Sequence, residues 1–172
     1  MPRGGLSIAI AAVLSACAGG DDTIQDIMRE AVNPAASAIW GAAALESTAQ
    51  GTREFSPRED AEWDALKRHA NALIASAGRL EIPRKVAPPG AILADTNFEG
   101  NLKAPDIQTG IDSDFDGFIG RAWTLRDAGK FVLDVIEKRD AERLAEAGEL
   151  VNEACSACHD AYWFPNSIQP VQ

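Results

Sequence analysis

Apolar positions recur at spacings of three and four residues along four stretches of the chain, which is the pattern of amphipathic helices. The first stretch begins at Asp21, and Asp21, Asp22 or Thr23 can cap it. Pro34 interrupts this stretch, which continues to residue 47. Because proline lacks a backbone N–H, we expect a kink or a local break around Asn33.

The second stretch has a clear start signal in Ser56-Pro57-Arg58-Glu59. A serine followed three residues later by glutamate forms a capping box, and proline suits the first helical position. One apolar face then runs from Trp63 to Ala77 and ends at Gly78. The pattern predicts a second helix with these bounds.

A third helix is expected after Gly117 or Gly120, and a fourth after Asp140, which can cap it, until Pro165. Residues 80–118 hold four prolines and four glycines and show no sustained period, so they are expected to form a long loop, functional or lying over a pocket. The chain is therefore predicted to be all-α, an antiparallel four-helix bundle with a long loop between helices two and three. The alternative is a two-helix hairpin with a disordered remainder.

Composition agrees with a single helical domain. The chain has 172 residues, of which 46% are hydrophobic and 24% are charged, which excludes a disordered acidic tail and a multi-span membrane protein. The formal net charge of −10 repels phosphate backbones, so nucleic acid is not expected as a partner.

The first residues have the pattern of an export signal. Arg3 precedes an uninterrupted apolar run over residues 6–14, which is too short to cross a bilayer. Leu14-Ser15-Ala16-Cys17 resembles the lipobox of bacterial lipoproteins, which implies a signal peptide over residues 1–16, acyl chains on Cys17 and a tether over residues 17–22. The alternative is an ordinary secreted protein that is cut near Cys17.

The strongest chemical motif is Cys155-Ser156-Ala157-Cys158-His159, the C-x-x-C-H attachment site of a c-type haem. Positions i, i+3 and i+4 share one helix face, so both thiols can form thioethers to the haem while the imidazole reaches the iron. A thioredoxin-like redox pair would instead start a helix after a strand, and a zinc site would need a fourth ligand, such as His69 or an acid. A structural disulfide gains little across two residues. Predicted export favours haem, because covalent haem attachment occurs outside the cytoplasm.

With this motif in the last predicted helix, and Tyr162 three residues after His159, the chain resembles cytochrome c′, the class II c-type cytochromes. The resemblance is architectural over most of the chain and motif-specific over residues 150–165. It implies that residues 23–172 form a four-helix domain with one covalent haem c, that Cys155 and Cys158 hold the haem, and that His159 is the proximal iron ligand. Trp163 departs from the family, many of whose members carry a basic residue there.

The resemblance also implies that the first helix builds the distal face of the haem. Met28 is the only methionine after the predicted signal peptide and lies in this helix. Methionine opposite histidine raises the reduction potential and suits electron transfer, so Met28 is the candidate distal ligand. Alternatively, Met28 only fills the core, which leaves a five-coordinate haem that binds nitric oxide or carbon monoxide. His69, at the edge of an apolar stripe, is a rival ligand.

An acidic stretch carries a second, weaker metal signal. Asp112, Asp114, Asp116 and Gly117 match the first half of an EF-hand loop, but Trp123 stands where that loop needs an acid. Calcium binding is one interpretation. The other is an acidic turn that caps the third helix.

No set of nucleophile, base and acid, no phosphate loop and no paired catalytic carboxylates stand out, so we expect no enzyme. The sequence predicts an exported monohaem cytochrome that exchanges electrons with redox proteins of the periplasm or membrane. It would lie on the periplasmic side of a bacterial membrane, anchored through Cys17, or free in the periplasm if the lipobox is not used. The resemblance allows a homodimer. The competing hypotheses are a gas-binding or sensing cytochrome and a helical lipoprotein without haem.

Overall fold

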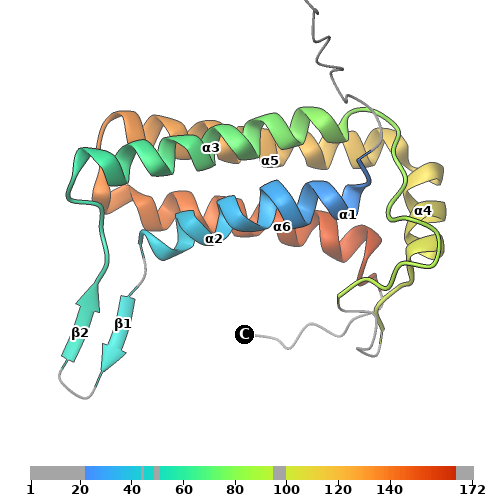
Figure 1. The fold of residues 1–172 in the computed structure, drawn as a ribbon, viewed down its shortest axis with the longest axis horizontal. Helices are drawn as coiled ribbons and strands as arrows, with labels where there is room; N and C mark the ends of the chain where they lie inside the picture. The colour runs from blue at the N-terminus through green and yellow to red at the C-terminus, as the bar shows by residue number, and fades with distance from the viewer. Residues whose placement is uncertain (1–21, 44, 49–50, 95–99, 166–172) are drawn as a thin grey trace, which may run out of the picture.

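Helices dominate the computed structural model, which describes residues 22–43, 45–48, 51–94 and 100–165. The predicted all-α class is confirmed, with one short hairpin added (Figure 1). The elements are α1 (Ile24–Ile27), the π-helical η1 (Met28–Val32), α2 (Asn33–Gly41), β1 (Leu45–Thr48), β2 (Gly51–Glu54), α3 (Asp60–Leu80), α4 (Ala104–Ser113), α5 (Phe115–Glu137), the 3₁₀-helical η2 (Ala141–Arg143) and α6 (Leu144–Tyr162).

The first helix starts and breaks where the sequence predicts. Thr23 is its N-cap, and its hydroxyl accepts a hydrogen bond from the N–H of Asp26 at 3.2 Å. The break before Pro34 is a π-helical turn, in which the N–H of Asn33 bonds to the carbonyl of Met28 five residues earlier. The wider turn changes the hydrogen-bond register just before the proline, which has no N–H to donate.

The predicted end of this helix is wrong, because α2 ends at Gly41 rather than near residue 47. Glycine disfavours a helix interior, and the chain beyond it pairs as an antiparallel hairpin with Leu45 opposite Glu54. The hairpin projects from one end of the molecule (Figure 1).

The predicted capping box of the second helix is also wrong. Helix α3 begins at Asp60, after Ser56 and Pro57. The reason is Glu62, whose carboxylate accepts hydrogen bonds from the backbone N–H of Arg58 at 2.7 Å and of Glu59 at 2.9 Å. These bonds make Glu59 the N-cap, and the helix then continues through Gly78 to Leu80.

The predicted long loop contains a helix that the sequence analysis did not find. In α4, Ile107 and Ile111 lie four residues apart and both are buried. Gly110 lies inside α4 and Gly117 lies inside α5, which begins at Phe115, earlier than expected. The prolines and glycines of this region predict a loop, but burial of the isoleucines stabilises helix here.

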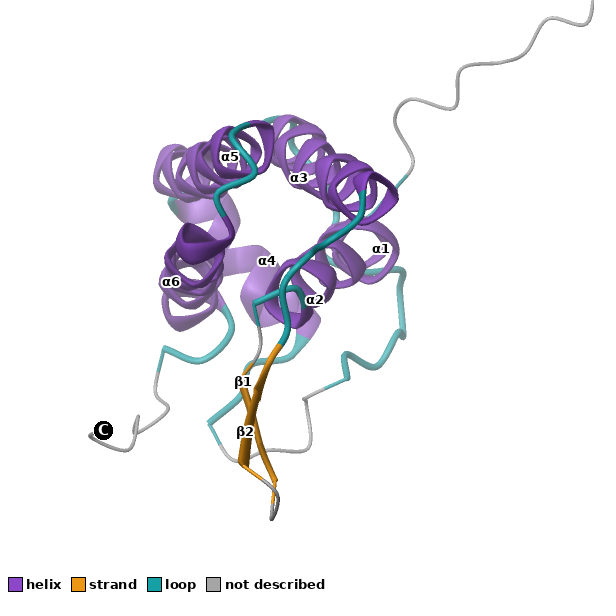
Figure 2. Ribbon diagram, turned by 90° about the vertical axis from the view of Figure 1, so that its left-hand side faces the viewer, coloured by secondary structure: helices purple, strands orange, loops and turns teal. Residues whose placement is uncertain are grey.

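The helices pack around one core, as Figure 2 shows. Helix α3 lies along α5, α5 lies along α6, and α2 contacts both α3 and α6, while α4 contacts α5 and α6 at the end opposite the hairpin. The most deeply buried side chains come from all of these elements and include Ile27, Ile39, Leu73, Ile107, Val132, Leu144 and Val151. This packing fixes the end of α6 relative to α1.

Helices α3 and α5 approach each other closely at Gly129. A Cβ there would lie 3.0 Å from Cγ1 of Ile74 and 3.3 Å from Cβ of Leu73. Gly129→Leu should therefore lower the free energy of unfolding by about 1–3 kcal/mol through overpacking, measured by urea denaturation. Gly120 of the same helix is a matched control, because a Cβ there would meet nothing within 4 Å. Gly120→Ala should be neutral or raise stability by up to about 1 kcal/mol, and equal effects at the two sites would contradict the close approach.

The predicted signal peptide over residues 1–16, Cys17 and most of the tether lie outside the described residues. Within the described ranges, no helix combines the length and apolar character needed to cross a membrane.

Candidate functional site

The C-x-x-C-H motif occupies the last two turns of α6. Cys155 and Cys158 are free thiols, partly buried, and both pack against the core. His159 is in the final turn, and its carbonyl accepts the N–H of Trp163 at 2.8 Å and that of Phe164 at 2.9 Å. Because the helix ends here, the chain after it folds back onto His159.

Burial raises the pKa of the Cys155 thiol and raises that of Cys158 to about 12, partly offset at Cys158 by the positive charge of Arg121. Both thiols are therefore neutral at physiological pH. A reactive redox pair needs a lowered thiol pKa, which is typical of a helix N-terminus. The position at the helix C-terminal end and the raised pKa values both oppose the thioredoxin-like interpretation.

His159 and Met28 line the same cavity, which has a volume of about 230 Å³. We call this space the Met28–His159 cavity. Helix α6 contributes His159, and the first helical segment contributes Met28, where the π-helical turn begins. The structure thus brings together the predicted proximal and distal ligands, which are far apart in the sequence.

Gln25, Met28, Arg29 and Asn33 of the first helical segment line this cavity, and the π-helical turn lets Met28 and Asn33 face it together. Met28 and Asn33 would lie about 140° apart around a regular α-helix, since each residue turns by about 100°. In the π-helical turn five residues make little more than one full turn, so the two residues share a face and both line the cavity. The turn before Pro34 therefore shapes the site and also accommodates the missing N–H of the proline.

The connection between α3 and α4 covers the Met28–His159 cavity, as the sequence analysis expects of a long loop. Its Val86, Leu93 and Leu102 line the cavity, and Val86 and Leu93 are buried. Hydrogen bonds hold the connection to α1, since the N–H of Ile24 bonds to the carbonyl of Lys85 and the N–H of Gln25 to that of Val86, both at 2.9 Å. The carbonyl groups of this connection, which we call the cover, thus accept the hydrogen bonds of the first backbone N–H groups of α1.

Aromatic rings surround the imidazole. The Trp163 ring lies 5.5 Å from the His159 ring, and the Phe164 ring meets it edge-on at 5.7 Å, measured between centroids. Both aromatic residues line the Met28–His159 cavity. The N–H of Leu102 donates to the carbonyl of Trp163 at 3.0 Å, which joins the cover to the end of α6.

Tyr162, three residues after His159 in α6, is buried in the core. Its hydroxyl donates to the Asp114 carboxylate at 2.9 Å, and the Phe118 ring meets its ring edge-on at 5.6 Å. The guanidinium of Arg121 lies over the tyrosine ring, 5.2 Å from its centroid. A cation from α5 therefore lies at Tyr162, although Trp163 stands where many cytochromes c′ carry a basic residue.

Burial and the hydrogen bond to Asp114 raise the pKa of Tyr162 to about 12, against about 10 in an unfolded chain. Its contribution to stability is therefore complete below about pH 10 and is lost as the pH rises towards 12. We expect Tyr162→Phe to flatten the loss of unfolding free energy between about pH 10 and 12. Because Tyr162 is the only tyrosine, phenolate absorbance reports its titration directly. A midpoint near 10 in the folded protein would contradict the assignment.

The acidic stretch is divided between α4, the single residue that joins α4 to α5, and α5, and it does not form a calcium loop. Asp112 is in α4 and accepts a hydrogen bond from Gln108 at 2.9 Å, Asp114 binds Tyr162, and Asp116 lies in the first turn of α5. Gly117 leaves room for the Asp114 carboxylate, which a Cβ at this position would overlap. The structure favours the acidic turn, although the Asp114 side chain does not cap α5.

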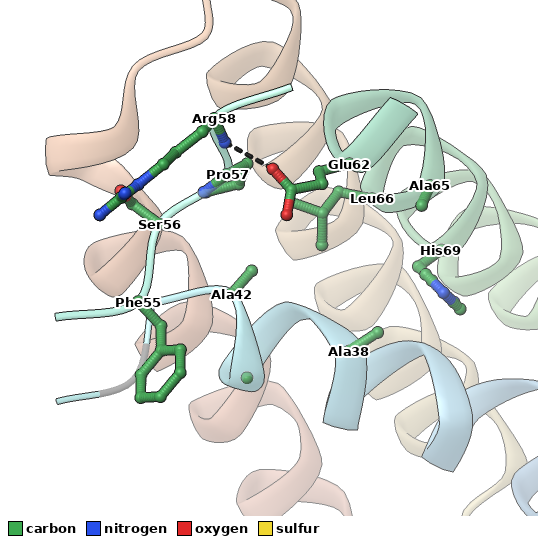
Figure 3. A pocket seen from close by; sticks show the side chains of 11 residues that line it. Ala38, Ala42, Phe55, Ser56, Pro57, Arg58, Glu62, Ala65, Leu66 and His69 are labelled. Carbon is green, nitrogen blue, oxygen red and sulfur yellow. Dashed lines mark hydrogen bonds between the residues drawn. The ribbon is translucent and has the colours of Figure 1, made fainter. Parts of the chain in front are cut away.

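His69 lies away from His159. It lines a second cavity of about 500 Å³ between α2 and α3, together with residues such as Ala38 and Leu66 (Figure 3). Within the described ranges, no three or more His, Cys, Asp or Glu side chains converge as a metal site. His69 is thus not placed to complete a zinc site with the two cysteines or to share an iron with His159.

Comparison with protein-family models, with curated proteins and with solved structures gives no match to this chain.

Sequence reasoning missed Arg121, Asn33 and Leu93. In the sequence, Arg121 is a positively charged residue like others on an amphipathic helix, and nothing near it indicates its partners on α6. Leu93 belongs to a short apolar run, residues 91–94, in a connection without a sustained period. The one available signal was Pro34, which predicts a disturbed helix next to Met28 but not the π-helical register.

Proposed function

We propose that this protein is an exported electron-transfer cytochrome of class II, with one covalently bound haem c. The observation that carries the proposal is that His159 of C-x-x-C-H and Met28 line one cavity. An imidazole and a thioether from opposite elements are the ligand pair of a high-potential, low-spin haem.

The residues of the motif and Met28 fit a haem in chemistry, with His159 and Met28 lining the cavity and the two cysteines packed against the core on the same helix as His159. Cys155 and Cys158 are partly buried thiols one helical turn apart, and each would form a thioether by adding its S–H across a haem vinyl group. The imidazole of His159 would be the proximal ligand and the sulfur of Met28 the distal one. The bound haem supplies a reversible one-electron couple between Fe(III) and Fe(II).

The surrounding side chains favour electron transfer. Val86, Leu93 and Leu102 form an apolar cover, and Trp163 and Phe164 shield the imidazole. Polar side chains such as Arg29, Asn33 and Asn101 also line the cavity, so it is the apolar and aromatic part of the lining that disfavours the more highly charged oxidised state and raises the reduction potential. A methionine ligand acts in the same direction.

The packing of the helices supports the finer architecture that we propose. The segment from α1 to α2 together with α3, α5 and α6 would form the antiparallel four-helix bundle, with α4 and the cover as its long connection. Haem sites in such bundles are built in the core from side chains on facing helices. Residues 23–172 would be this domain, exported by the signal peptide, anchored through Cys17 on the periplasmic side and served by periplasmic or membrane redox partners.

A gas-binding cytochrome is the second candidate. Met28 is only partly buried and packs against the core, so the cavity beside it is space that a small distal ligand needs. In that case Met28 would shape the distal side without binding iron.

The optical spectrum of the full chain, produced together with haem-attachment enzymes, tests these functions. We expect a Soret band, a low-spin spectrum and a near-infrared methionine-to-iron band in the oxidised protein. A high-spin spectrum that responds to nitric oxide or carbon monoxide would support the gas-binding function instead. Absence of a Soret band would leave an exported helical lipoprotein and contradict the proposal.

A further inference from the structure

Arg121 of α5 is held against the turn of α6 that carries the two cysteines. Its Nε donates to the carbonyl of Ala157 at 3.0 Å, and Ala157 directly precedes Cys158. Its Nη1 donates to the carbonyl of Gly117 at 3.1 Å. With Tyr162 under the guanidinium, Arg121 is fixed from three directions.

The charge of Arg121 is not neutralised by an ion pair among the described residues. The other arginine of the same helix that lies over an aromatic ring, Arg126, pairs with Glu81 of α3 at 3.1 Å. Both partners of Arg121 are backbone carbonyls, which fix its position without cancelling its charge. A rigid, partly buried guanidinium therefore stands beside the Cys158 thiol.

We propose that Arg121 raises the reduction potential of the haem by holding a fixed positive charge at the attachment turn. The inference rests on the function proposed above. Oxidation adds one positive charge to the iron, and a nearby cation makes this state less favourable. The interaction is strongest where solvent screening is weak, as it is for a partly buried group. Arg121 acts on the reduction potential through its charge and does not bind the haem iron.

Three substitutions separate charge from hydrogen bonding. Arg121→Lys keeps the charge, Arg121→Gln keeps a donor without charge, and Arg121→Met removes both. Arg126→Gln is the matched control, since it removes a cation from the same helix that faces Glu81 and Trp123. Each protein is the full chain matured with haem, and its haem content is measured by intact mass before the potential is determined by optical redox titration.

We expect Arg121→Gln and Arg121→Met to shift the oxidation equilibrium about tenfold towards the oxidised form, a drop of about 59 mV for one electron. Arg121→Lys should retain most of the potential, and Arg126→Gln should leave it unchanged. A wild-type potential in haem-loaded Arg121→Gln would overturn the inference, as would a drop in Arg121→Lys as large as that in Arg121→Gln. If Arg121→Met holds no haem, the lysine and glutamine variants still decide. A wild-type protein without haem would instead refute the proposed function, and this inference with it.

Discussion

Replacing both Cys155 and Cys158 by serine should abolish covalently bound haem. A serine hydroxyl is a far weaker nucleophile than a thiol and does not form the bond to the haem vinyl group, although it is close to cysteine in size. Each single variant should keep one thioether and therefore keep some covalent haem. Haem staining after denaturing electrophoresis, combined with intact mass, measures the outcome.

Ser156→Ala is the matched control for the cysteine variants. Ser156 lies between the two cysteines and is exposed, so its loss should leave haem attachment at the wild-type level. Because both thiols pack against the core, the fold of the double variant should be checked by far-ultraviolet circular dichroism. Haem that stays covalently attached to a folded double variant would contradict the assigned role of the two thiols.

The second large effect is expected at Met28. Met28→Leu keeps an apolar side chain of similar volume but removes the sulfur, so it should abolish the near-infrared methionine-to-iron band and convert the oxidised haem towards high spin. The reduction potential should fall as well, because the thioether ligand favours the reduced iron. Carbon monoxide should then bind to the reduced protein at the vacated position.

Met28→Leu also distinguishes ligation from packing. If Met28 only fills the core, an exchange of methionine for leucine costs less than about 1.5 kcal/mol and leaves the spectrum unchanged. His69→Ala is the control, since His69 lines a different cavity and should not affect the haem. A low-spin spectrum and an unchanged reduction potential in Met28→Leu would contradict ligation by Met28.

The local parts of the fold could be predicted from the sequence. The cap at Thr23 and the cap at Asp140, which accepts from the N–H of Arg143 at 3.3 Å, depend on residues three positions away. The break at Pro34 follows from a missing N–H. Such features are encoded over one or two helical turns, so the pattern of residues predicts them.

Elements that depend on distant contacts were not predicted. Helix α4 carries Pro105 and Gly110, which hide its period, and it is stabilised by burying Ile107 and Ile111. Likewise, α3 begins at Asp60 because the Glu62 carboxylate accepts hydrogen bonds from the N–H groups of Arg58 and Glu59. The capping box that the sequence predicts at Ser56 does not start the helix. Tertiary burial and competing caps decide these positions, and neither is visible in a local pattern.

The candidate site likewise has residues that a local pattern predicts and contacts that depend on tertiary packing. The spacing of Cys155, Cys158 and His159 is a helical pattern, and the structure places it on a helix. Met28 is the candidate distal ligand because it is the only methionine after the predicted signal peptide, and the cavity that it shares with His159 agrees with this prediction. The contacts of Arg121 across α5 and α6 come only from tertiary packing, so the sequence could not indicate them.

Intact-mass measurement of the mature wild-type protein, made with the haem-attachment enzymes and analysed under denaturing conditions, tests the central claim most directly. We predict that the polypeptide carries the added mass of one haem, and that a peptide containing Cys155 and Cys158 retains it after proteolysis. A mature protein whose mass is that of the polypeptide and its lipid alone, with both thiols open to alkylation, would contradict the account.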